Sequence, residues 1–434
     1  MSSKVSSLGR LPAQPVPPFT YGADPELFLE ADGQIIGSEK VIPKEGLAYS
    51  GEVAGKDVNP FVVRDGVQVE VHPAPAHCRV QVGGSLGQTF ASLAMKIEQE
   101  NVRRAALKVP LPPVKACWRS VITVSPAEMD SLTDDSKKFG CQESLNIYGD
   151  NPNLAEVNAE SYPFRAAGGH IHIGLGAVWA DPEAYAKVQE KTQQLNQRLW
   201  EYNLPRDKYD KVYAEYKAYI ASDEYKHAAR TRPPFEKYPA DDFIRLMDIF
   251  VGNTGVLLDR DELAAERRRY YGRAGEYRTP AHGYEYRVLS NWWARSYQMA
   301  SFVWGMTRLA GAVLFNNNTF KRDFYDKLME DIDIDRVRRA INENNLILAK
   351  ANWKTVRKFI NKHVTDLTNP ASSHILPLGP NVLDDFEHFL EKGIEHWFPV
   401  EQDWLANWSR AQGPGWEMFL TTTVAQDRAK KKEV

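Results

Sequence analysis

Four short segments of the sequence carry ionisable side chains two positions apart. The pairs are Asp24 with Glu26, Glu70 with His72, His170 with His172, and Glu285 with Arg287. Because successive side chains of a β-strand point to opposite faces, both members of each pair would lie on one face of its strand. The neighbouring residues are mostly Val, Ile and Tyr, so the opposite face would be apolar.

Such a polar face differs from an ordinary solvated sheet surface, which is rich in Thr, Ser and Lys. Clustered carboxylates repel one another unless a cation neutralises them, and a divalent metal ion is the usual solution. If the four strands belong to one sheet, their polar sides would line a common cleft with acids, imidazoles and a guanidinium. The spacing therefore predicts a metal-binding cleft.

Each pair alone also has an ordinary explanation. The first acidic pair could simply end a solvent-facing strand. Glu70 could form an ion pair with Arg64 or Arg79, and Glu285 with Arg287 could be a plain ion pair on a sheet. The joint occurrence of the pairs, with matching alternation, favours a site more strongly than any one of them.

The histidine pair is open to two further readings. His170 and His172 could be structural, or they could hold zinc as in some hydrolases. They are flanked by Gly168, Gly169 and Gly174. Glycines in strands often mark the close approach of a ligand or of another backbone segment, which favours a functional role for the pair.

Positive charge is concentrated in one later segment. Its arginines are Arg260, Arg267, Arg268, Arg269, Arg273, Arg278, Arg287 and Arg295. We expect Arg267–Arg269 to form a solvated helix end, whereas Arg273 and Arg278 lie in a loop with glycines. Planar guanidinium groups bind phosphate and carboxylate bidentately. Acids for metal beside arginines for phosphate indicate a metal–nucleotide site, although the sequence contains no Walker A or Rossmann glycine motif.

Composition excludes several broad classes. The chain has 434 residues, 54 Lys+Arg against 57 Asp+Glu, and a net charge of −3, so bulk nucleic-acid binding is not expected. Hydrophobic residues make up 43% and charged residues 26%, which excludes wholesale disorder. The three cysteines Cys78, Cys117 and Cys141 are too few and too scattered for a disulfide framework or a zinc ribbon.

Nothing in the sequence predicts a membrane or secretory segment. Residues 1–18 are rich in proline and read as a flexible leader with no apolar core of a signal peptide. The longest apolar run, Met299 to Phe315, is interrupted by Arg308 and indicates a buried core helix. We therefore expect a cytoplasmic protein.

The element order predicts an α+β fold with a largely antiparallel sheet. Asp-Gly turns that follow strand-like residues 21–29 and 61–64 predict two hairpins, with return strands at 34–36 and 67–72. Residues 85–105, 240–258 and 297 onward have helical spacing, with a break near 369–380, while 168–175 and 284–288 read as strands. Residues 106–162 read as turn-rich, and 181–230 as a charged helical insertion.

These motifs resemble the carboxylate–amine ligases of the glutamine synthetase and glutamate–cysteine ligase superfamily, and most of all the phage-type "COOH–NH2 ligase, type 2" group. The matching segments, in the order of the superfamily, are Gly22–Phe28, Asp65–Pro73, Gly168–Gly174, Gly275–Arg278 and Gly283–Ser290. The resemblance spans about residues 20–295. It does not extend to the 181–230 insertion or to most of the C-terminal region.

The resemblance implies an antiparallel, half-barrel-like sheet backed by helices, whose concave face binds ATP and Mg²⁺ (Mn²⁺ is an alternative). An acyl phosphate formed with ATP would react with an amine. By position, the metal ligands would be Asp24, Glu26, Glu70, His170 and Glu285. His172, Arg273, Arg278 and Arg287 would contact the nucleotide phosphates, and His172, Arg278 and Arg287 would act in catalysis.

The resemblance also implies a division of the chain and a set of partners. We expect a catalytic domain at 19–315 and a mostly helical region at 316–434. The partners would be a small-molecule or peptide carboxylate and an amine acceptor, with no membrane, and an oligomer is compatible with the sequence. The sequence departs from the family at Asp24, where Glu is usual, and in the proline that follows it. The alternatives are a metal-dependent hydrolase using the histidine pair, and a non-catalytic phage binding protein that has kept the fold.

Overall fold

The computed structural model describes a helix-backed sheet and the helices that follow it. The described residues are 19–48, 53–54, 61–76, 79–137, 144–149, 163–175, 190–191, 194–195, 198, 205–225, 240–259, 261–280, 282–315, 323–367, 390–391 and 408. Within them, nine strands join one antiparallel sheet, and the sheet stays open rather than closing into a barrel. The predicted α+β class is therefore confirmed.

The main path of the sheet runs in the order β3-β4-β1-β9-β11-β10-β7. The long first strand β1 also pairs with β2 and β5 along its second half. The strands are β1 (Phe19–Ala31), β2 (Gln34–Ile36), β3 (Val62–Asp65), β4 (Gln68–Val71), β5 (Val114–Cys117), β7 (Leu145–Asn146), β9 (Gly169–Leu175), β10 (Glu276–Arg278) and β11 (Gly283–Tyr286). Both predicted hairpins, β1–β2 and β3–β4, are confirmed.

The register of the sheet brings the four polar pairs side by side. Asp24 lies opposite His170, and Glu26 lies opposite Glu70. On the other side of β9, His172 lies opposite Glu285. Cross-strand neighbours have Cβ atoms about 4.5–5.5 Å apart, so these side chains form one continuous polar patch on one face.

Pro25 separates the first acidic pair and marks a change of partner. Pro25 lies opposite Gly169 on β9, while the pairing of β1 with β4 covers only Glu26 and Leu27. Proline has no backbone N–H to donate to a neighbouring strand. The ladder to β9 thus covers Phe19 to Pro25, and the ladder to β4 begins directly after the proline.

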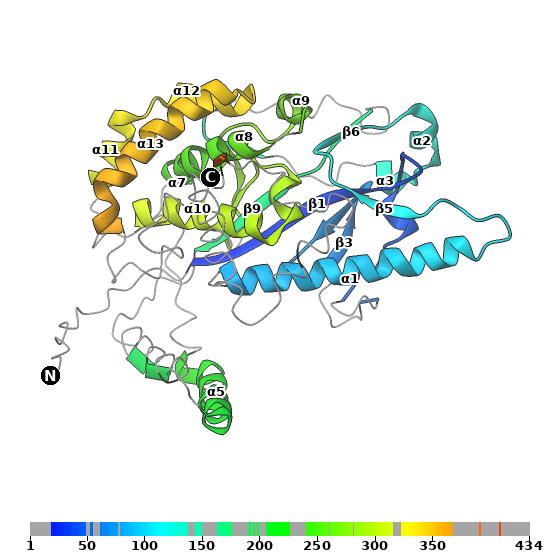
Figure 1. Cartoon of the computed structure of the whole chain (residues 1–434), viewed down its shortest axis with the longest axis horizontal. Coiled ribbons are helices and arrows are strands. Elements are labelled where there is room, and N and C mark those ends of the chain that lie inside the picture. The colour runs from blue at the N-terminus through cyan, green and yellow to red at the C-terminus, as the bar shows by residue number, and fades with distance from the viewer. Residues whose placement is uncertain are drawn as a thin grey trace, which may run out of the picture.

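The opposite face of the sheet is apolar and is covered by helices. Ile171, Ile173, Val69 and Tyr286 are buried there in the main core. The covering helices are α1 (Arg79–Ala105), α7 (Ala240–Met247) and α10 (Tyr297–Phe315), and α1 and α10 also pack against each other. Figure 1 shows α1 running along the length of the sheet.

The predicted helices 85–105 and 297–315 are thus confirmed. Leu86, Phe90 and Leu93, which predicted the first of them, are fully buried. Each such side chain contributes about 1.5–3 kcal/mol by leaving water. None of the helices in the described ranges is long and apolar enough to cross a bilayer.

The segment 106–162 contains more regular structure than its turn-rich sequence predicted. Besides β5 and β7 it forms β6 (Val121–Thr123), which pairs with β8 (Phe164–Ala166), and the short helices α2 (Pro126–Ser131) and α3 (Asp134–Lys137). Ser125 caps α2 in a reciprocal capping box with Glu128. Strands this short carry too little alternation to be recognised from sequence.

The predicted apolar helix at 240–258 is confirmed but interrupted. After α7, residues Asp248–Gly252 form a π-helical segment, η4, and α8 (Asn253–Leu258) follows. Further along lie α9 (Ala264–Tyr270) and the 3₁₀ turn η5 (Asn291–Arg295), whereas another 3₁₀ turn, η1 (Ser38–Lys40), follows β2. The π segment carries the buried residue Asp248 behind the sheet.

The C-terminal part of the described chain is helical, as predicted. It comprises α11 (Asp323–Asp331), α12 (Ile334–Asn342) and α13 (Leu346–Leu367), which gather at one end of the molecule (Figure 1). Within the predicted insertion at 181–230, α5 (Arg206–Ile220) is helical and lies to one side of the sheet in Figure 1. The predicted leader 1–18 and the break near 369–380 lie outside the described residues.

Candidate metal and phosphate site

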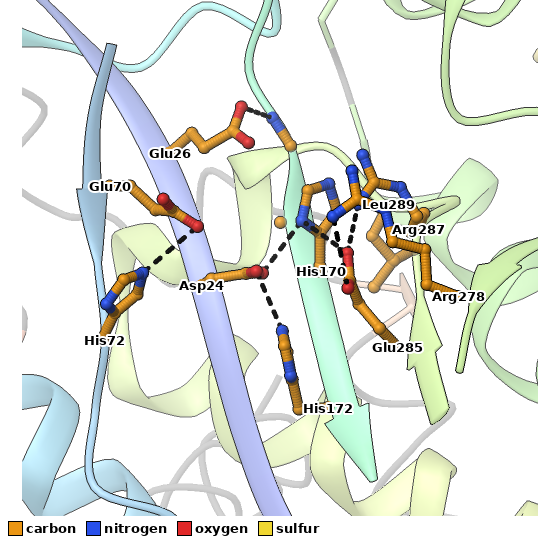
Figure 2. A network of polar contacts seen from close by, with 12 residues as sticks. Asp24, Glu26, Glu70, His72, His170, His172, Arg278, Glu285, Arg287 and Leu289 are labelled. Atoms are coloured by element: carbon orange, nitrogen blue, oxygen red, sulfur yellow. Dashed lines mark hydrogen bonds and ion pairs between the residues drawn. The ribbon is translucent and has the colours of Figure 1, made fainter. Parts of the chain in front are cut away.

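The centre of the polar face holds a buried cluster of Asp24 on β1, His170 on β9 and Glu285 on β11 (Figure 2). Nδ1 of His170 lies 2.9 Å from Oδ1 of Asp24 and 3.5 Å from Oε1 of Glu285. One ligand atom of each residue lies within 4.8 Å of the other two. Two carboxylates and an imidazole at this separation fit the ligand shell of a divalent metal ion.

Two atoms of this cluster face each other without forming a hydrogen bond. Among the described residues, Oδ1 of Asp24 and Nδ1 of His170 have no partner of hydrogen-bond geometry, although they are 2.9 Å apart and shielded from solvent. A buried polar atom left in this state costs about 1–3 kcal/mol. A cation ligated by both atoms would remove that cost, so the donor set fits a metal ion.

The protonation states of the cluster also fit a metal ion. Burial alone would raise the pKa of Asp24, but the neighbouring imidazoles of His170 and His172 hold it well below its usual value. For His170, burial outweighs the attraction of Asp24 and lowers the pKa. At neutral pH the pair is therefore a carboxylate and a neutral imidazole, which are the forms that ligate metals.

Arginines border the cluster on the β10–β11 side. Nη1 of Arg287 donates to Oε1 of Glu285, and Nη1 of Arg278 lies 3.7 Å from its Oε2. Arg287 is fully buried, whereas the side chain of Arg278 is 25% exposed. Two guanidinium groups directly beside a metal-type cluster are suited to a bound phosphate.

Arg273 joins this region through its backbone. Its N–H donates to Oε1 of Glu276 at 3.0 Å, and the N–H of Gly272 donates to Oε2. Burial raises the pKa of Glu276, partly offset by these N–H groups. Sequence reasoning missed Glu276, which fixes the loop that carries Arg273. Among the described residues, no contact ties the Arg273 guanidinium to the cluster.

His172 occupies the open end of the cluster. Its Nε2 lies 2.9 Å from Oδ2 of Asp24, so the Asp24 carboxylate lies between the two histidines (Figure 2). Burial would lower the pKa of His172, but the charge and hydrogen bond of Asp24 raise it overall. Its Nδ1 lies 3.0 Å from Nε2 of His282, and the two rings stack at 5.1 Å. His282 stands in the loop before β11, where the sequence offers no spacing signal.

Glu26 is brought to the polar face but points away from the metal-type cluster. Its Oε2 accepts from the N–H of Gly168 at 2.7 Å and lies 3.2 Å from Nε2 of Gln68. Burial, followed by the charges of Asp65 and Glu70, raises its pKa well above the usual value. Glu26 therefore holds the entrance of β9 in place and adds to a dense group of acids.

Glu70 lies on the outer side of that group. Its Oε1 is 3.3 Å from Nε2 of His72, and both side chains are partly exposed. Burial raises the pKa of Glu70, partly offset by the hydrogen bond from His72. Asp65, in the turn of the second hairpin, shares this environment, and its pKa is raised by burial and by the charge of Asp24. The sequence placed Asp65 only in a turn.

The arginines of α9 differ from the prediction of a solvated helix end. Arg269 is exposed, but Arg267 and Arg268 are buried. The guanidinium of Arg267 donates to the carbonyl oxygens of Ala167, Val288 and Leu289. The prediction was wrong for these two residues because tertiary carbonyl acceptors, invisible in a local charge count, replace their hydration. Arg267 thereby joins the segment before β9 to the segment after β11.

Gly169 illustrates why glycines surround the histidine pair. A side chain there would collide with the backbone oxygen of Ser290 and with the indole of Trp293. The N–H of Gly169 donates to Leu289, and Trp293 Nε1 donates to its carbonyl oxygen. The close approach predicted from glycine is therefore that of another backbone segment.

Comparison with known proteins gives a partial match. Residues 237–355 match a family model described as "Phage phiEco32-like COOH.NH2 ligase-type 2". The matched range contains Arg273, Arg278, Glu285 and Arg287, whereas the first strands with Asp24 lie outside it. A search of curated proteins finds no match.

One solved structure with a similar arrangement is described as a bifunctional glutathione synthetase from Pasteurella multocida. It shares 11% sequence identity at a TM-score of 0.37, with 93% of this chain and 52% of that chain covered. This chain thus spans about half the length of that protein. Over residues 237–355, which carry the arginine side of the site, the chain is similar to carboxylate–amine ligases.

Proposed function

We propose that this protein is an ATP- and Mg²⁺-dependent carboxylate–amine ligase. In the proposed reaction, a substrate carboxylate attacks the γ-phosphate of ATP and releases ADP. The resulting acyl phosphate reacts with an amine, which forms an amide and releases phosphate and a proton. Mn²⁺ would serve in place of Mg²⁺.

The observation that carries this proposal is the sharing of Glu285 between two kinds of group. One oxygen of Glu285 faces the donors Asp24 and His170, and both oxygens face arginines. The metal-type cluster consists of Asp24, His170 and Glu285. The phosphate-type cluster consists of Glu285, Arg278 and Arg287, so the two clusters share one carboxylate. Phosphoryl transfer needs charge neutralisation and positioning more than a protein nucleophile, and the described side chains of this site offer those two things.

The residues would divide the work along the sheet. Asp24, His170 and Glu285 would hold the metal ion, with Glu26 and Glu70 as candidates for further ions. When bound, the metal ion would neutralise charge on the phosphate oxygens. Arg287 and Arg278 would hold the transferring phosphoryl group, Arg273 would reach the nucleotide from its loop, and His172 would stand at the open end of the site.

The remaining parts of the proposal concern architecture. The open antiparallel sheet would be the half-barrel of the glutamine synthetase type, with residues 19–315 as the catalytic unit. Residues 316–434 would then form an accessory helical region. The substrates would be a small-molecule or peptide carboxylate and an amine.

A metal-dependent hydrolase is less well supported by the geometry. Such an enzyme would use both histidines on one ion, yet among the described residues the metal-type cluster contains only His170. His172 is engaged instead with Asp24 and His282. A hydrolase would also have no need for the arginines around Glu285.

The test is ADP formation by the purified protein with Mg²⁺, ATP and a panel of carboxylate and amine pairs. We expect ADP release that requires all four components. Nucleotide binding would be measured in parallel by calorimetry at millimolar ATP and Mg²⁺. Failure to bind ATP under those conditions would reject the ligase, and stoichiometric tightly bound zinc would favour the hydrolase.

A further inference from the structure

Tyr271 contacts the one nitrogen of His170 that faces away from the cluster. The residue follows α9 directly and is buried. Its hydroxyl group is hydrogen-bonded to Nε2 of His170, while Nδ1 of the same ring faces Asp24 and Glu285. The rings meet edge to face at 5.6 Å. Both nitrogens of this buried imidazole are therefore directed by neighbours.

The Tyr271 ring is itself held in place by arginines. The guanidinium carbon of Arg267 lies 4.8 Å from the ring centroid, and that of Arg287 lies 5.1 Å from it. Arg267 is fixed by three backbone carbonyl groups, so it provides a rigid support. Arg287 also donates to Glu285. Tyr271 thus contacts a member of the metal-type cluster and a member of the phosphate-type cluster.

The hydroxyl group has a consequence for where the imidazole proton resides. A neutral imidazole carries one proton, on either Nδ1 or Nε2. If Nδ1 carried it, that nitrogen could donate to Asp24 but could not ligate a metal. The hydroxyl group of Tyr271 can either donate to Nε2 or accept from Nε2–H. In the accepting role it keeps the proton on Nε2 and leaves the Nδ1 lone pair directed at Asp24 and Glu285.

We propose that Tyr271 is a positioning residue that selects the Nε2–H form of His170 and so prepares Nδ1 as a metal ligand. The inference rests on the proposed function only in that it takes the cluster to bind a divalent metal. The Tyr271→Phe variant tests it, because phenylalanine keeps the ring between the arginines and removes only the hydroxyl group.

The first measurement is Mn²⁺ affinity by calorimetry, without nucleotide. We expect Tyr271→Phe to bind Mn²⁺ about 10-fold more weakly, as is typical when the partner of a metal-ligating histidine is lost. Tyr286→Phe is the matched control, since it also removes a buried tyrosine hydroxyl group, but on the apolar face, where that group donates to Asp248 at 2.7 Å. The control should bind Mn²⁺ as the unaltered protein does.

The second measurement reports on the imidazole proton of the unaltered protein itself. Nitrogen-15 NMR of histidine-labelled, metal-free protein reports which ring nitrogen carries the proton, and the His170 signal is assigned by its loss in His170→Gln. We expect the proton on Nε2 of His170. A proton on Nδ1 would overturn the inference, as would equal Mn²⁺ affinity of Tyr271→Phe and the unaltered protein.

These outcomes are separable from those of the proposed function. Suppose that Tyr271→Phe weakens Mn²⁺ binding but that no substrate pair yields ADP. The role of Tyr271 would then stand, and the ligase proposal would be rejected. Suppose instead that the protein forms ADP normally, while Tyr271→Phe leaves Mn²⁺ affinity and the position of the imidazole proton unchanged. The ligase proposal would then stand, and the role of Tyr271 would be rejected.

Discussion

His170 and His172 lie two residues apart on the same face of β9, yet their surroundings differ. His170 is enclosed by Tyr271, Arg287 and two carboxylates, and burial lowers its pKa. His172 is 21% exposed, and the charge of Asp24 raises its pKa against the effect of burial. Identical side chains on one strand thus differ in the protonation state that their surroundings favour, neutral for His170 and protonated for His172.

The difference comes from the neighbouring strands rather than from β9. Both imidazoles lie 2.9 Å from the Asp24 carboxylate. At the His170 end, the charge of Arg287, which directly follows β11, adds to burial in lowering the pKa. At the His172 end, the charges of Asp24, Glu285 and Glu70 together raise the pKa against burial. Strand alternation sets which side chains share a face, and the flanking strands then decide what each side chain can do.

The largest effect is expected where the two histidines share a partner. Asp24→Asn removes the negative charge between them, so turnover should fall by about 10²–10³-fold, as is typical when a charge-stabilising group is lost from an active site. The measurement is ADP formation at saturating ATP and Mg²⁺. Asp32→Asn, in the exposed turn after β1, is the control, and equal losses in both variants would contradict the assignment.

A direct comparison of the two histidines comes next. His170→Gln should weaken Mn²⁺ binding by about 100-fold, because it removes a metal ligand, whereas His172→Gln should weaken it by less than about 10-fold. Calorimetric titration of both variants measures the difference. If His172→Gln caused the greater loss, the metal would lie at the open end of the site.

The effect of the surroundings on pKa is also seen when Asp24 is compared with a buried acid outside the site. Asp248 lies behind the sheet and accepts from the hydroxyl group of Tyr286 at 2.7 Å. Burial raises the pKa of Asp248 from its usual value of 3.8 to about 6. Burial also acts on Asp24, but two imidazoles reverse the effect there. A buried acid without imidazole partners is therefore protonated well above its usual range.

This shift predicts a pH dependence of stability. The pKa of Asp248 is higher in the folded protein than in the unfolded chain. Its contribution to the free energy of unfolding is therefore fully present below about pH 4 and is lost as the pH rises to about 6, a change of about 3 kcal/mol. Asp248→Asn should remove this part of the pH dependence. Urea unfolding at pH 4, 5 and 6.5 measures it, and an unchanged slope in the variant would place the shift elsewhere.

The smallest effect is expected at the exposed end of the site. His282→Ala removes the hydrogen bond to Nδ1 of His172, which is worth about 1 kcal/mol and hence about a fivefold change in turnover. Mn²⁺ affinity should stay unchanged, because the hydrogen bond of His282 is to His172, which lies outside the metal-type cluster. A loss of Mn²⁺ binding as large as that of His170→Gln would contradict the separation of the two ends.

Sequence alternation predicted the polar face well, because its physical basis is local. The pairs around Asp24, Glu70, His170 and Glu285 each follow from the two-residue period of a strand. Pairing order and register are non-local, and the sequence predicted only that the strands could share a sheet. That assumption is confirmed, and the assignment of each side chain to metal or phosphate stays a prediction.

The residues that sequence reasoning missed share a different property. Tyr271 follows a helix, Glu276 begins the three-residue strand β10, and His282 lies in a turn, so no periodicity marks them. Arg267 was assigned to solvent because its local sequence is charged, yet it is buried by carbonyl groups that arrive from two other segments. Side chains positioned by tertiary contacts alone leave no regular pattern in the sequence.

The paired strands of the site lie far apart in the sequence, and this separation has a consequence for how the chain acquires its site. His172 meets Asp24 across 148 residues of sequence and His282 across 110. Pairs so distant form slowly, because long loops must close before the contacts stabilise them. During synthesis, at about 5–20 residues per second, His170 and His172 emerge several seconds before Glu285 does. The nascent chain therefore carries an incomplete set of ligands, and the cluster can assemble only after β11 has been made.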